Sequence, residues 1–300
     1  MKRELVMQNL NWRLNDIVTN LKAIAGQGFT TIQVSPLQQH KEADNPAWWL
    51  AYQITNFKIG NRLGNEEDLK ILCDAAHKLN IKIIVDVVCN HVANDGYGRD
   101  FIPSKEVEAE ILNNPYFFLT PFEIDNWYDR YQVCYGNCGW PKLNTANKEL
   151  QCIIIHYLCN LMQCGVDGFR FDAAKHIPVE KNFNNDFWPT ITKAIRNIKN
   201  DAFIYGELQD LDTPLIDEYA QYIYVGVNNR LGSDPTKKVI YNLSHDDILT
   251  FNVKSDKGWN ILLDEHEYLL KSNPDSHILY YPHDEMWRES RMSDINHKFR

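Results

Sequence analysis

The sequence predicts an α/β protein in which eight parallel strands, most of them followed by a helix, close into a (β/α)8 barrel of the TIM type. Short apolar runs alternate with segments of helical periodicity along the 300 residues, which is typical of repeated βα units. Eight such runs occur, and setting aside one long irregular stretch leaves roughly 245 residues, the usual size of this barrel. A doubly wound sheet is the competing fold, but no apolar run leads into G-x-G-x-x-G and no P-loop sequence is present.

The first part of the barrel contains three predicted strands and two predicted helices. Residues 6–12 form the first strand, and 14–27 is helical because its apolar residues recur at every third or fourth position. Residues 30–36 are the second strand, an apolar run that ends at a proline. After a loop rich in Trp and Asn, residues 65–80 form a helix with an N-cap candidate and an acidic first turn. Residues 81–91 are apolar almost throughout, as a strand buried on both faces should be.

The stretch 92–146 breaks this alternation. It holds glycines, prolines, aromatic and acidic residues with neither the helical nor the strand period. Barrel connections usually run about 2–6 residues, so a stretch of this length predicts a small inserted domain. We therefore expect a first barrel part over 1–91, the inserted domain over 92–146 and a second barrel part over 147–300.

The second barrel part resumes the alternation with helical patterns over about 147–164 and 187–200. The remaining predicted strands cover 165–172, 201–208, 222–227, 239–247 and 277–282. The final helix is barely begun when the chain reaches Arg300. We therefore expect an apolar edge between the first and last units of the barrel, and from it either a marginally stable monomer or a dimer.

The charge balance argues against several classes of function. There are 31 basic and 40 acidic residues, a net charge of -9, and no run of Lys or Arg. Binding of nucleic acid or of an anionic membrane surface is therefore not expected. No apolar stretch approaches the ~20 residues of a membrane span, and the N-terminus lacks the apolar core of a signal peptide. We expect a cytoplasmic protein, the alternative being a secreted chain with a trimmed N-terminus.

The seven cysteines fit a reduced protein, because their number is odd and most lie in apolar stretches. Cys134 and Cys138 have the spacing of a disulfide or of half a metal site. No second Cys or His pair lies at zinc-site spacing, so we interpret both as structural.

Four predicted strands end in acidic residues, which are Asp86, Asp172, Glu207 and Asp246. Active sites of these barrels lie at the carboxyl ends of the strands, where these side chains would meet. Alternation places Arg170 on the same face as Asp172, and the guanidinium is expected to keep that carboxylate ionised. Gly206, directly before Glu207, is expected to leave room for a ligand.

A site with several carboxylates predicts a hydrolase. A single acid is more often a helix N-cap or an ion-pair partner, but four at strand ends are harder to explain in that way. The chain also holds 8 Trp and 15 Tyr, whose rings stack on the C–H faces of sugars. Two carboxylates across a glycosidic bond provide glycosidase chemistry, in which one attacks or activates water and the other protonates the leaving oxygen.

Five motifs occur in a fixed order: DVVCNH at 86–91, WPKLN at 140–144, GFRFDAAKH at 168–176, GEL at 206–208 and SHD at 244–246. On these motifs the chain resembles the α-amylase family of glycoside hydrolases over nearly its whole length. The irregular stretch then corresponds to domain B, which the family inserts after the third strand of its barrel. We expect the C-terminal β-sandwich common in the family to be absent from this chain.

The resemblance implies a role for each of three carboxylates. Asp172 is the nucleophile, Glu207 the general acid/base and Asp246 the residue that stabilises the transition state. The reaction would proceed by double displacement with retention of configuration, for which two carboxyl groups stand ~5–5.5 Å apart.

The resemblance also implies substrate-binding residues, which are Tyr52, Asp86, His91, Arg170, Lys175, His176 and His245. Tyr52 matches a stacking tyrosine, whereas His91, Arg170 and His245 match groups that hold hydroxyls and charge beside the bond to be cleaved. Lys175 and His176 match a pair on the leaving-group side that favours α-1,4-glucans. Asp86 is expected mainly to orient Arg170 and the strand ends.

A calcium ion is the one cofactor that the resemblance raises, and none is needed for the chemistry. Asn90 matches a calcium ligand of the family, but Lys142 stands where an aspartate ligand is found in calcium-dependent members. An ammonium group there would repel a divalent cation and could fill its place. We therefore expect no calcium requirement.

Three interpretations of function remain open from the sequence. The first is a hydrolase of α-1,4-glucosidic bonds in starch, glycogen or maltooligosaccharides. The second is a 4-α-glucanotransferase, an α-glucosidase or a neopullulanase-type enzyme with the same site. The third is a catalytically silent barrel that binds α-glucans, against which the presence of all three acids argues.

Overall fold

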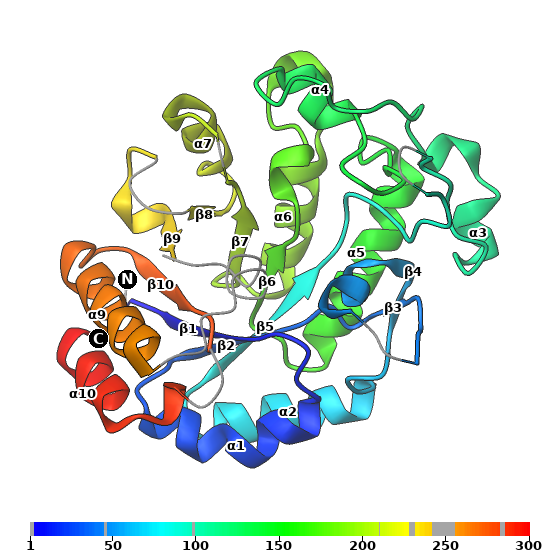
Figure 1. The fold of residues 1–300 in the computed structure, drawn as a ribbon. Coiled ribbons are helices and arrows are strands. Elements are labelled where there is room, and N and C mark those ends of the chain that lie inside the picture. Colours follow the sequence, from blue (N-terminus) through cyan, green and yellow to red (C-terminus); the bar gives the residue numbers. More distant parts are fainter. Residues whose placement is uncertain are drawn as a thin grey trace.

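The computed structural model describes residues 3–44, 47–97, 100–209, 211–227, 232–241, 256–282 and 286–300. Eight parallel strands close into a barrel in the order β1-β10-β9-β8-β7-β6-β5-β2, with the helices on its outside (Figure 1). The strands are β1 (Leu5–Asn9), β2 (Thr31–Val34), β5 (Lys82–Val87), β6 (Gly168–Phe171), β7 (Phe203–Glu207), β8 (Tyr224–Val227), β9 (Lys238–Ile240) and β10 (His277–Tyr280). The predicted fold class is confirmed.

Four outer helices match the segments of predicted helical periodicity, namely α1 (Leu14–Gly26), α2 (Glu66–His77), α5 (Lys148–Gln163) and α6 (Phe187–Ile198). Two more, α7 (Thr213–Tyr219) and α9 (Asp256–Ser272), were not predicted, and only the start of α10 (Ser290–Phe299) was expected. The Asn65 side chain accepts hydrogen bonds from the backbone of Glu67 and Asp68, and the Asp68 carboxylate accepts one from the backbone of Asn65. This capping box satisfies the free amide groups where α2 begins.

Alternation along the strands sorts the side chains into two apolar layers. Ile83 and Val85 of β5 pack outward against the helices, in the larger of the two core clusters. Ile84 points into the barrel, where it meets Val6 and Phe203 from other strands. Polar side chains that also point inward lie near the carboxyl end of the barrel. The site described below forms there.

Three elements between β2 and α2 were not predicted by the sequence analysis. β3 (Gln38–His40) and β4 (Ile54–Ile59) form a small antiparallel sheet, and a short 3-10 helix, Trp48–Tyr52, lies between them. The strands were missed because one has three residues, all polar, and because apolar and polar residues do not alternate cleanly along the other.

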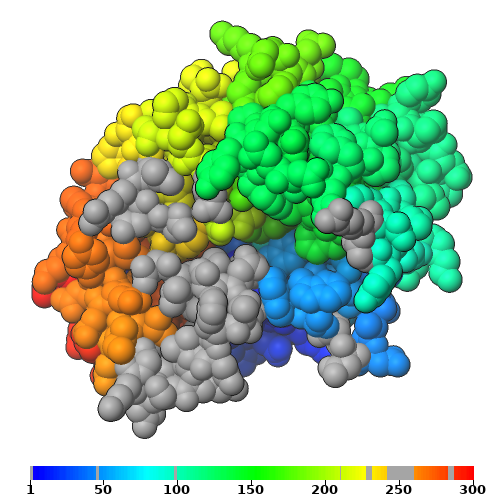
Figure 2. Space-filling model, turned by 45° about the horizontal axis from the view of Figure 1, so that its top comes forward, coloured from blue at the N-terminus to red at the C-terminus, as the bar shows by residue number. Residues whose placement is uncertain are grey.

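The long insertion between β5 and α5 lies against this small sheet. Ala93 donates a backbone hydrogen bond to Ile54, and Glu108 donates one to Thr55. In its described residues the insertion holds two short α-helices, α3 (Ala109–Leu112) and α4 (Arg130–Tyr135), and a 3-10 helix, Pro115–Phe117. Figure 2 shows the green residues of this part of the chain directly beside blue residues of the segment after β2.

The two ends of the described chain lie close together beside α9 and α10 (Figure 1). Met292 and Ile295 of α10 are buried in the main core, and Nη1 of Arg3 donates to the carbonyl of Phe299 at 2.8 Å. The expected apolar edge between the first and last units is therefore wrong for the described residues. The expectation failed because Ser290–Phe299 forms nearly three helical turns, where the sequence suggested only the start of a helix.

Among the residues that the structure describes, no helix combines the length and apolar character that a membrane span requires.

Candidate active site

A cavity of about 220 Å³ opens at the carboxyl ends of β6 and β7. Its charged lining is formed by Arg170, Asp172, Lys175 and Glu207, with His176 beside them. Its aromatic lining is formed by Trp48, Trp49, Tyr52 and Trp140. The cavity thus combines ionisable groups with flat apolar rings, as a sugar-binding site requires.

The guanidinium of Arg170 connects three carboxylates. Nη1 lies 2.7 Å from Oδ2 of Asp86 and 2.9 Å from Oδ1 of Asp172. Nη2 lies 3.0 Å from Oε2 of Glu207. Arg170 is only 4% exposed, so these contacts are formed away from bulk water.

The register of the sheet explains why these groups meet. Asp86 pairs with Arg170 across β5 and β6, and Arg170 pairs with Tyr205 across β6 and β7. Asp172 and Glu207 each follow two residues later on their own strands, so both reach the same level at the mouth of the barrel.

The turn after β6 fixes the orientation of Glu207. Ala173 adopts a left-handed backbone with φ 48°, and its N–H donates to Oε2 of Glu207 at 3.0 Å. Gly206 is required by close packing with neighbouring side chains and does not provide access for a ligand. The sequence interpretation of this glycine was therefore wrong. A Cβ atom at Gly206 would lie 2.7 Å from the side chains of both Ala174 and Ile223.

The electrostatics of the cluster differ from the sequence expectation. Burial raises the pKa of Asp172 well above its ordinary value, and the negative charges of Glu207 and Asp86 add to this, although Arg170 opposes it. Burial likewise raises the pKa of Asp86. One guanidinium facing two buried carboxylates and the partly exposed Glu207 cannot balance all of them, so the free site favours keeping a proton within the cluster.

Tyr52 contacts this cluster, and His91 is linked to it through Tyr52. The hydroxyl of Tyr52 donates to Oδ2 of Asp86 at 2.9 Å, and its ring lies 5.9 Å from the guanidinium carbon of Arg170. His91 donates from Nε2 to the carbonyl of Tyr52 at 3.1 Å and stacks on Trp140, with ring centroids 4.4 Å apart. Burial lowers the pKa of His91 to about 3, so its ring is neutral.

Lys175 and His176 reach the cavity from the connection after β6. Nδ1 of His176 donates to the carbonyl of Val133 in α4 at 2.8 Å. Burial lowers the pKa of His176 well below its ordinary value, which leaves a neutral ring. Trp127 of the insertion lies edge-on to His176, and its ring centroid is 5.6 Å from Nζ of Lys175.

Several lining residues were not predicted as site residues. They are Trp48, Trp49, Cys138, Trp140 and Gln209, to which Trp127 can be added as a neighbour of the lining. Trp140 begins the WPKLN motif and Trp48 begins the paired tryptophans of the loop after β2, so both carried a signal. Cys138 and Gln209 carried none. His245 and Asp246 lie outside the described residues.

The segments that hold Asn90 and Lys142 run side by side where the insertion joins the barrel, since His91 is bridged to Lys142 and Leu143 donates a backbone hydrogen bond to Asn90. Oδ1 of Asn90 is buried without a hydrogen-bond partner in the described part of the chain. Lys142 is also buried, and its Nζ donates to the carbonyl of Val133 at 3.3 Å. No three His, Cys, Asp or Glu side chains of the described residues are grouped to hold a metal ion. A buried amine and one unpartnered amide oxygen in this region do not form the oxygen cage that calcium needs.

Burial lowers the pKa of Lys142 to about 7. Nearby Cys134 and Cys138 are free thiols, in agreement with the structural interpretation of this pair. Burial raises the pKa of Cys134 to about 12 and that of Cys138 above its ordinary value, so both thiols are protonated at neutral pH.

The chain is similar in sequence to known proteins. A family model described as the catalytic domain of α-amylase matches residues 13–231. An α-amylase of Clostridium acetobutylicum is 35% identical over 242 residues, which cover 77% of this chain and 31% of that protein. The chain spans about a third of the length of the curated relatives it matches.

Solved structures show the same fold at low identity. The α-amylase of Geobacillus thermoleovorans, complexed with acarbose, aligns with a TM-score of 0.72 at 20% identity, over 99% of this chain and 77% of that one. A cyclomaltodextrin glucanotransferase with three domains aligns with a TM-score of 0.77 at 16% identity, over 99% of this chain and 80% of that one. With the family model covering most of the barrel and the insertion, the chain belongs to the α-amylase family of glycoside hydrolases.

Proposed function

We propose that this chain carries the active site of a retaining glycosidase that hydrolyses α-1,4-glucosidic bonds of starch, glycogen or maltooligosaccharides. One observation carries the proposal. Asp172 and Glu207 reach the mouth of the barrel on adjacent strands, border the same cavity, and contact different nitrogens of one guanidinium. This arrangement suits the ~5–5.5 Å separation of a retaining pair.

In the first step Asp172 attacks the anomeric carbon of the sugar. The new bond joins an Asp172 oxygen to that carbon, the glycosidic C–O bond breaks, and the proton of Glu207 passes to the leaving oxygen. In the second step Glu207 takes a proton from water. The water oxygen bonds to the anomeric carbon, and the bond to Asp172 breaks. Two inversions at one carbon retain its configuration.

The charge of the cluster supports this assignment. Because Arg170 faces three carboxylates, the free site favours keeping a proton within the cluster, and burial favours it on Asp172 or Asp86. The first step requires that this proton lie on Glu207, so that Asp172 is ionised when it attacks. Glu207 is the more accessible partner, with a side chain 19% exposed against 11% for Asp172. The leaving oxygen can therefore reach Glu207 from the open side of the cavity.

Substrate would be held by the aromatic rings and by the groups around the two acids. Tyr52 and Trp140 offer stacking faces, and Lys175 and His176 offer polar groups for the hydroxyls of the leaving-group sugar. We assign Asp246 to stabilising the transition state and His245 to binding a hydroxyl, on the match of SHD to the family motif.

We further propose that the site works without calcium. Lys142 places a buried amine where the insertion meets the barrel, hydrogen-bonded to the end of α4. When protonated, this group supplies a fixed positive charge at the junction that a divalent ion would otherwise provide.

Incubation with maltoheptaose, with products resolved by chromatography, tests the proposal. Only shorter maltooligosaccharides are expected, and Glu207→Gln should abolish them. Products longer than the input would instead indicate a glucanotransferase, the activity named for one structural neighbour. Binding without turnover by the unsubstituted chain would indicate a silent glucan-binding barrel.

A further inference from the structure

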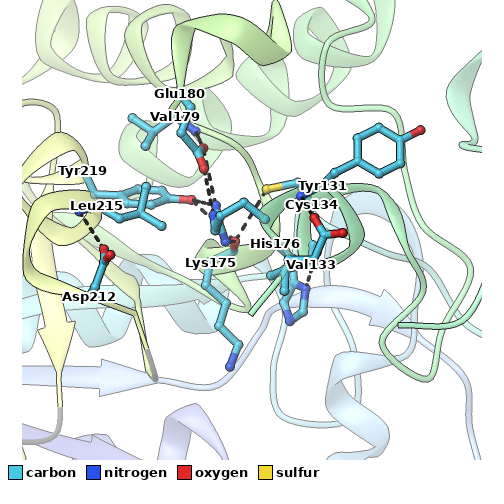
Figure 3. A network of polar contacts seen from close by, with 12 residues as sticks. Tyr131, Val133, Cys134, Lys175, His176, Val179, Glu180, Asp212, Leu215 and Tyr219 are labelled. Atoms are coloured by element: carbon cyan, nitrogen blue, oxygen red, sulfur yellow. Dashed lines mark hydrogen bonds and ion pairs between the residues drawn. The ribbon is translucent and has the colours of Figure 1, made fainter. Parts of the chain in front are cut away.

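Helix α4 of the insertion is fastened to the connection after β6 by an ion pair (Figure 3). Nε of Arg130 donates to Oε1 of Glu180 at 2.7 Å, and Nη1 of Arg130 donates to the carbonyl of Lys175 at 3.0 Å. The side chains of Arg130 and Glu180 are 22% and 16% exposed, so the pair is largely shielded from water. Arg130 thus contacts the backbone of Lys175, while the Lys175 side chain lines the cavity.

The rest of α4 continues this attachment with helical spacing. Arg130, Val133 and Cys134 are three and four residues apart and therefore share one face of the helix. The Val133 carbonyl accepts the hydrogen bond of His176, and Sγ of Cys134 lies 4.0 Å from the carbonyl of Lys175. One face of α4 therefore contacts both residues on the leaving-group side.

Tyr219 of α7 completes the network from the barrel. Its hydroxyl donates to the carbonyl of Ile177 at 2.7 Å and accepts from Nη2 of Arg130 at 3.2 Å. Tyr219 is fully buried, so it gives Arg130 a rigid support. Burial opposes the charge of Arg130, but the Glu180 hydrogen bond together with the other electrostatic interactions of the guanidinium outweighs it and raises the Arg130 pKa, so the ion pair persists at neutral pH.

We propose that Arg130 is a positioning residue for the leaving-group side of the site. It lies outside the cavity lining and acts through the backbone of Lys175, holding Lys175 and His176 where a sugar beyond the cleaved bond can meet them. The inference rests on the proposed function for the identity of that sugar. It does not require that the chain cleaves the sugar it binds.

Binding measured by calorimetry tests this in the Glu207→Gln background, where bound sugar is not cleaved. Maltoheptaose fills both sides of the cleaved bond, whereas a chloronitrophenyl α-maltotrioside places its sugars on the other side only. Arg130→Met should raise the Kd of maltoheptaose about tenfold and leave that of the aryl glycoside within about twofold. An equal change for both ligands, or no change for either, would overturn the proposal. Cleavage by the unsubstituted chain tests the proposed function separately.

A double variant separates positioning from stability. Arg130→Met alone leaves Glu180 without its partner, which destabilises the fold, whereas Arg130→Met with Glu180→Met removes both charges. The double variant should recover melting temperature and keep the weakened maltoheptaose binding, because Lys175 still lacks the Arg130 donor. Recovery of binding together with stability would show that Arg130 is only structural.

Three further variants complete the design. Arg130→Lys keeps the positive charge, but its single amine must serve both the Glu180 carboxylate and the Lys175 carbonyl. The Kd of maltoheptaose is therefore expected to lie between those of the parent and of Arg130→Met. Tyr219→Phe weakens the same network without changing charge and should raise the maltoheptaose Kd about two- to threefold. If the Arg130 variants do not fold, the maltoheptaose Kd of Tyr219→Phe still tests the proposal. Lys70→Met is the matched control, because its pair with Glu66 at 2.7 Å lies exposed on α2, and its binding should equal that of the parent.

Discussion

Nη2 of Arg170 lies 3.0 Å from Oε2 of Glu207, so a guanidinium that begins on β6 holds the side chain at the end of the neighbouring strand β7. The other terminal nitrogen of Arg170 is already shared by Asp86 and Asp172. The stability of this part of the barrel and the geometry of the two acids therefore depend on the same cation.

Arg170→Met should be strongly destabilising. The substitution leaves three carboxylates together in the barrel mouth without their cation, which typically costs about 3–5 kcal/mol for a broken buried ion pair. The free energy of unfolding from urea titration at pH 7 measures this loss. Arg62→Met is the control, since Arg62 is exposed and its guanidinium contacts the side chain of Asn11. Equal losses in the two variants would contradict the prediction.

Asp172→Asn should make the protein more stable at neutral pH while abolishing turnover. The folded state holds the Asp172 pKa above its ordinary value, so it binds more protons than the unfolded chain, and stability falls as pH rises through that range. The amide removes this loss, for a gain of about 1–2 kcal/mol.

Melting temperatures at pH 8 and pH 4 check the sign of this effect. The advantage of Asp172→Asn should be present at pH 8 and shrink toward pH 4, where the wild-type carboxyl is protonated in the folded state and about half protonated in the unfolded chain. A variant less stable than wild type at both pH values would show that the charge of Asp172 stabilises the fold.

Removal of calcium should leave the protein unchanged. Lys142 and Asn90 do not form an oxygen cage, so dialysis against EDTA is expected to alter neither the melting temperature nor the rate of maltoheptaose cleavage. Addition of Ca²⁺ after dialysis is the matched control. Loss of activity in EDTA that Ca²⁺ restores would contradict the calcium-independent site.

His266 should make the fold sensitive to mild acid. Its Nε2 donates to Oδ1 of Asn296 at 2.8 Å, and burial lowers its pKa to about 4. The unfolded chain therefore binds the proton first, and the stability contributed by the neutral ring is lost as pH falls from about 6.5 toward the folded value.

His266→Gln keeps a donor for Asn296 and should remove about 2 kcal/mol of the stability loss between pH 7 and pH 5. Urea unfolding at the two pH values measures the difference. The exposed His156→Gln should leave the loss as it is in wild type. A pH dependence unchanged by His266→Gln would refute this assignment.

The barrel was predictable because each strand is an apolar run that must be buried on both faces. The alternation of side chains along β6 is also sufficient to predict that Arg170 and Asp172 share one face of the strand. It did not predict the direction of the Asp172 pKa. That direction depends on how completely the mouth is shielded from water, and spacing along one strand carries no such information.

Arg130 and Glu180 show the limit of sequence reasoning more clearly. They lie 50 positions apart, in two segments without a regular period, and each alone resembles an ordinary surface charge. Only packing of α4 against the connection after β6 brings them together. The β3–β4 sheet was missed for a related reason, since its pairing depends on contacts across a loop and not on a local pattern.

The pairing of β1 with β10 affects how this chain folds during its synthesis on the ribosome. Leu5 pairs with Ile278, so the edge of β1 that pairs with β10 stays unpaired until nearly the whole chain has been synthesised. At the usual rate of synthesis this interval is on the order of tens of seconds. During that time an apolar strand has an open edge able to pair with other nascent chains. Synthesis speed and chaperone supply, more than the final stability of the barrel, should therefore set the yield of soluble protein.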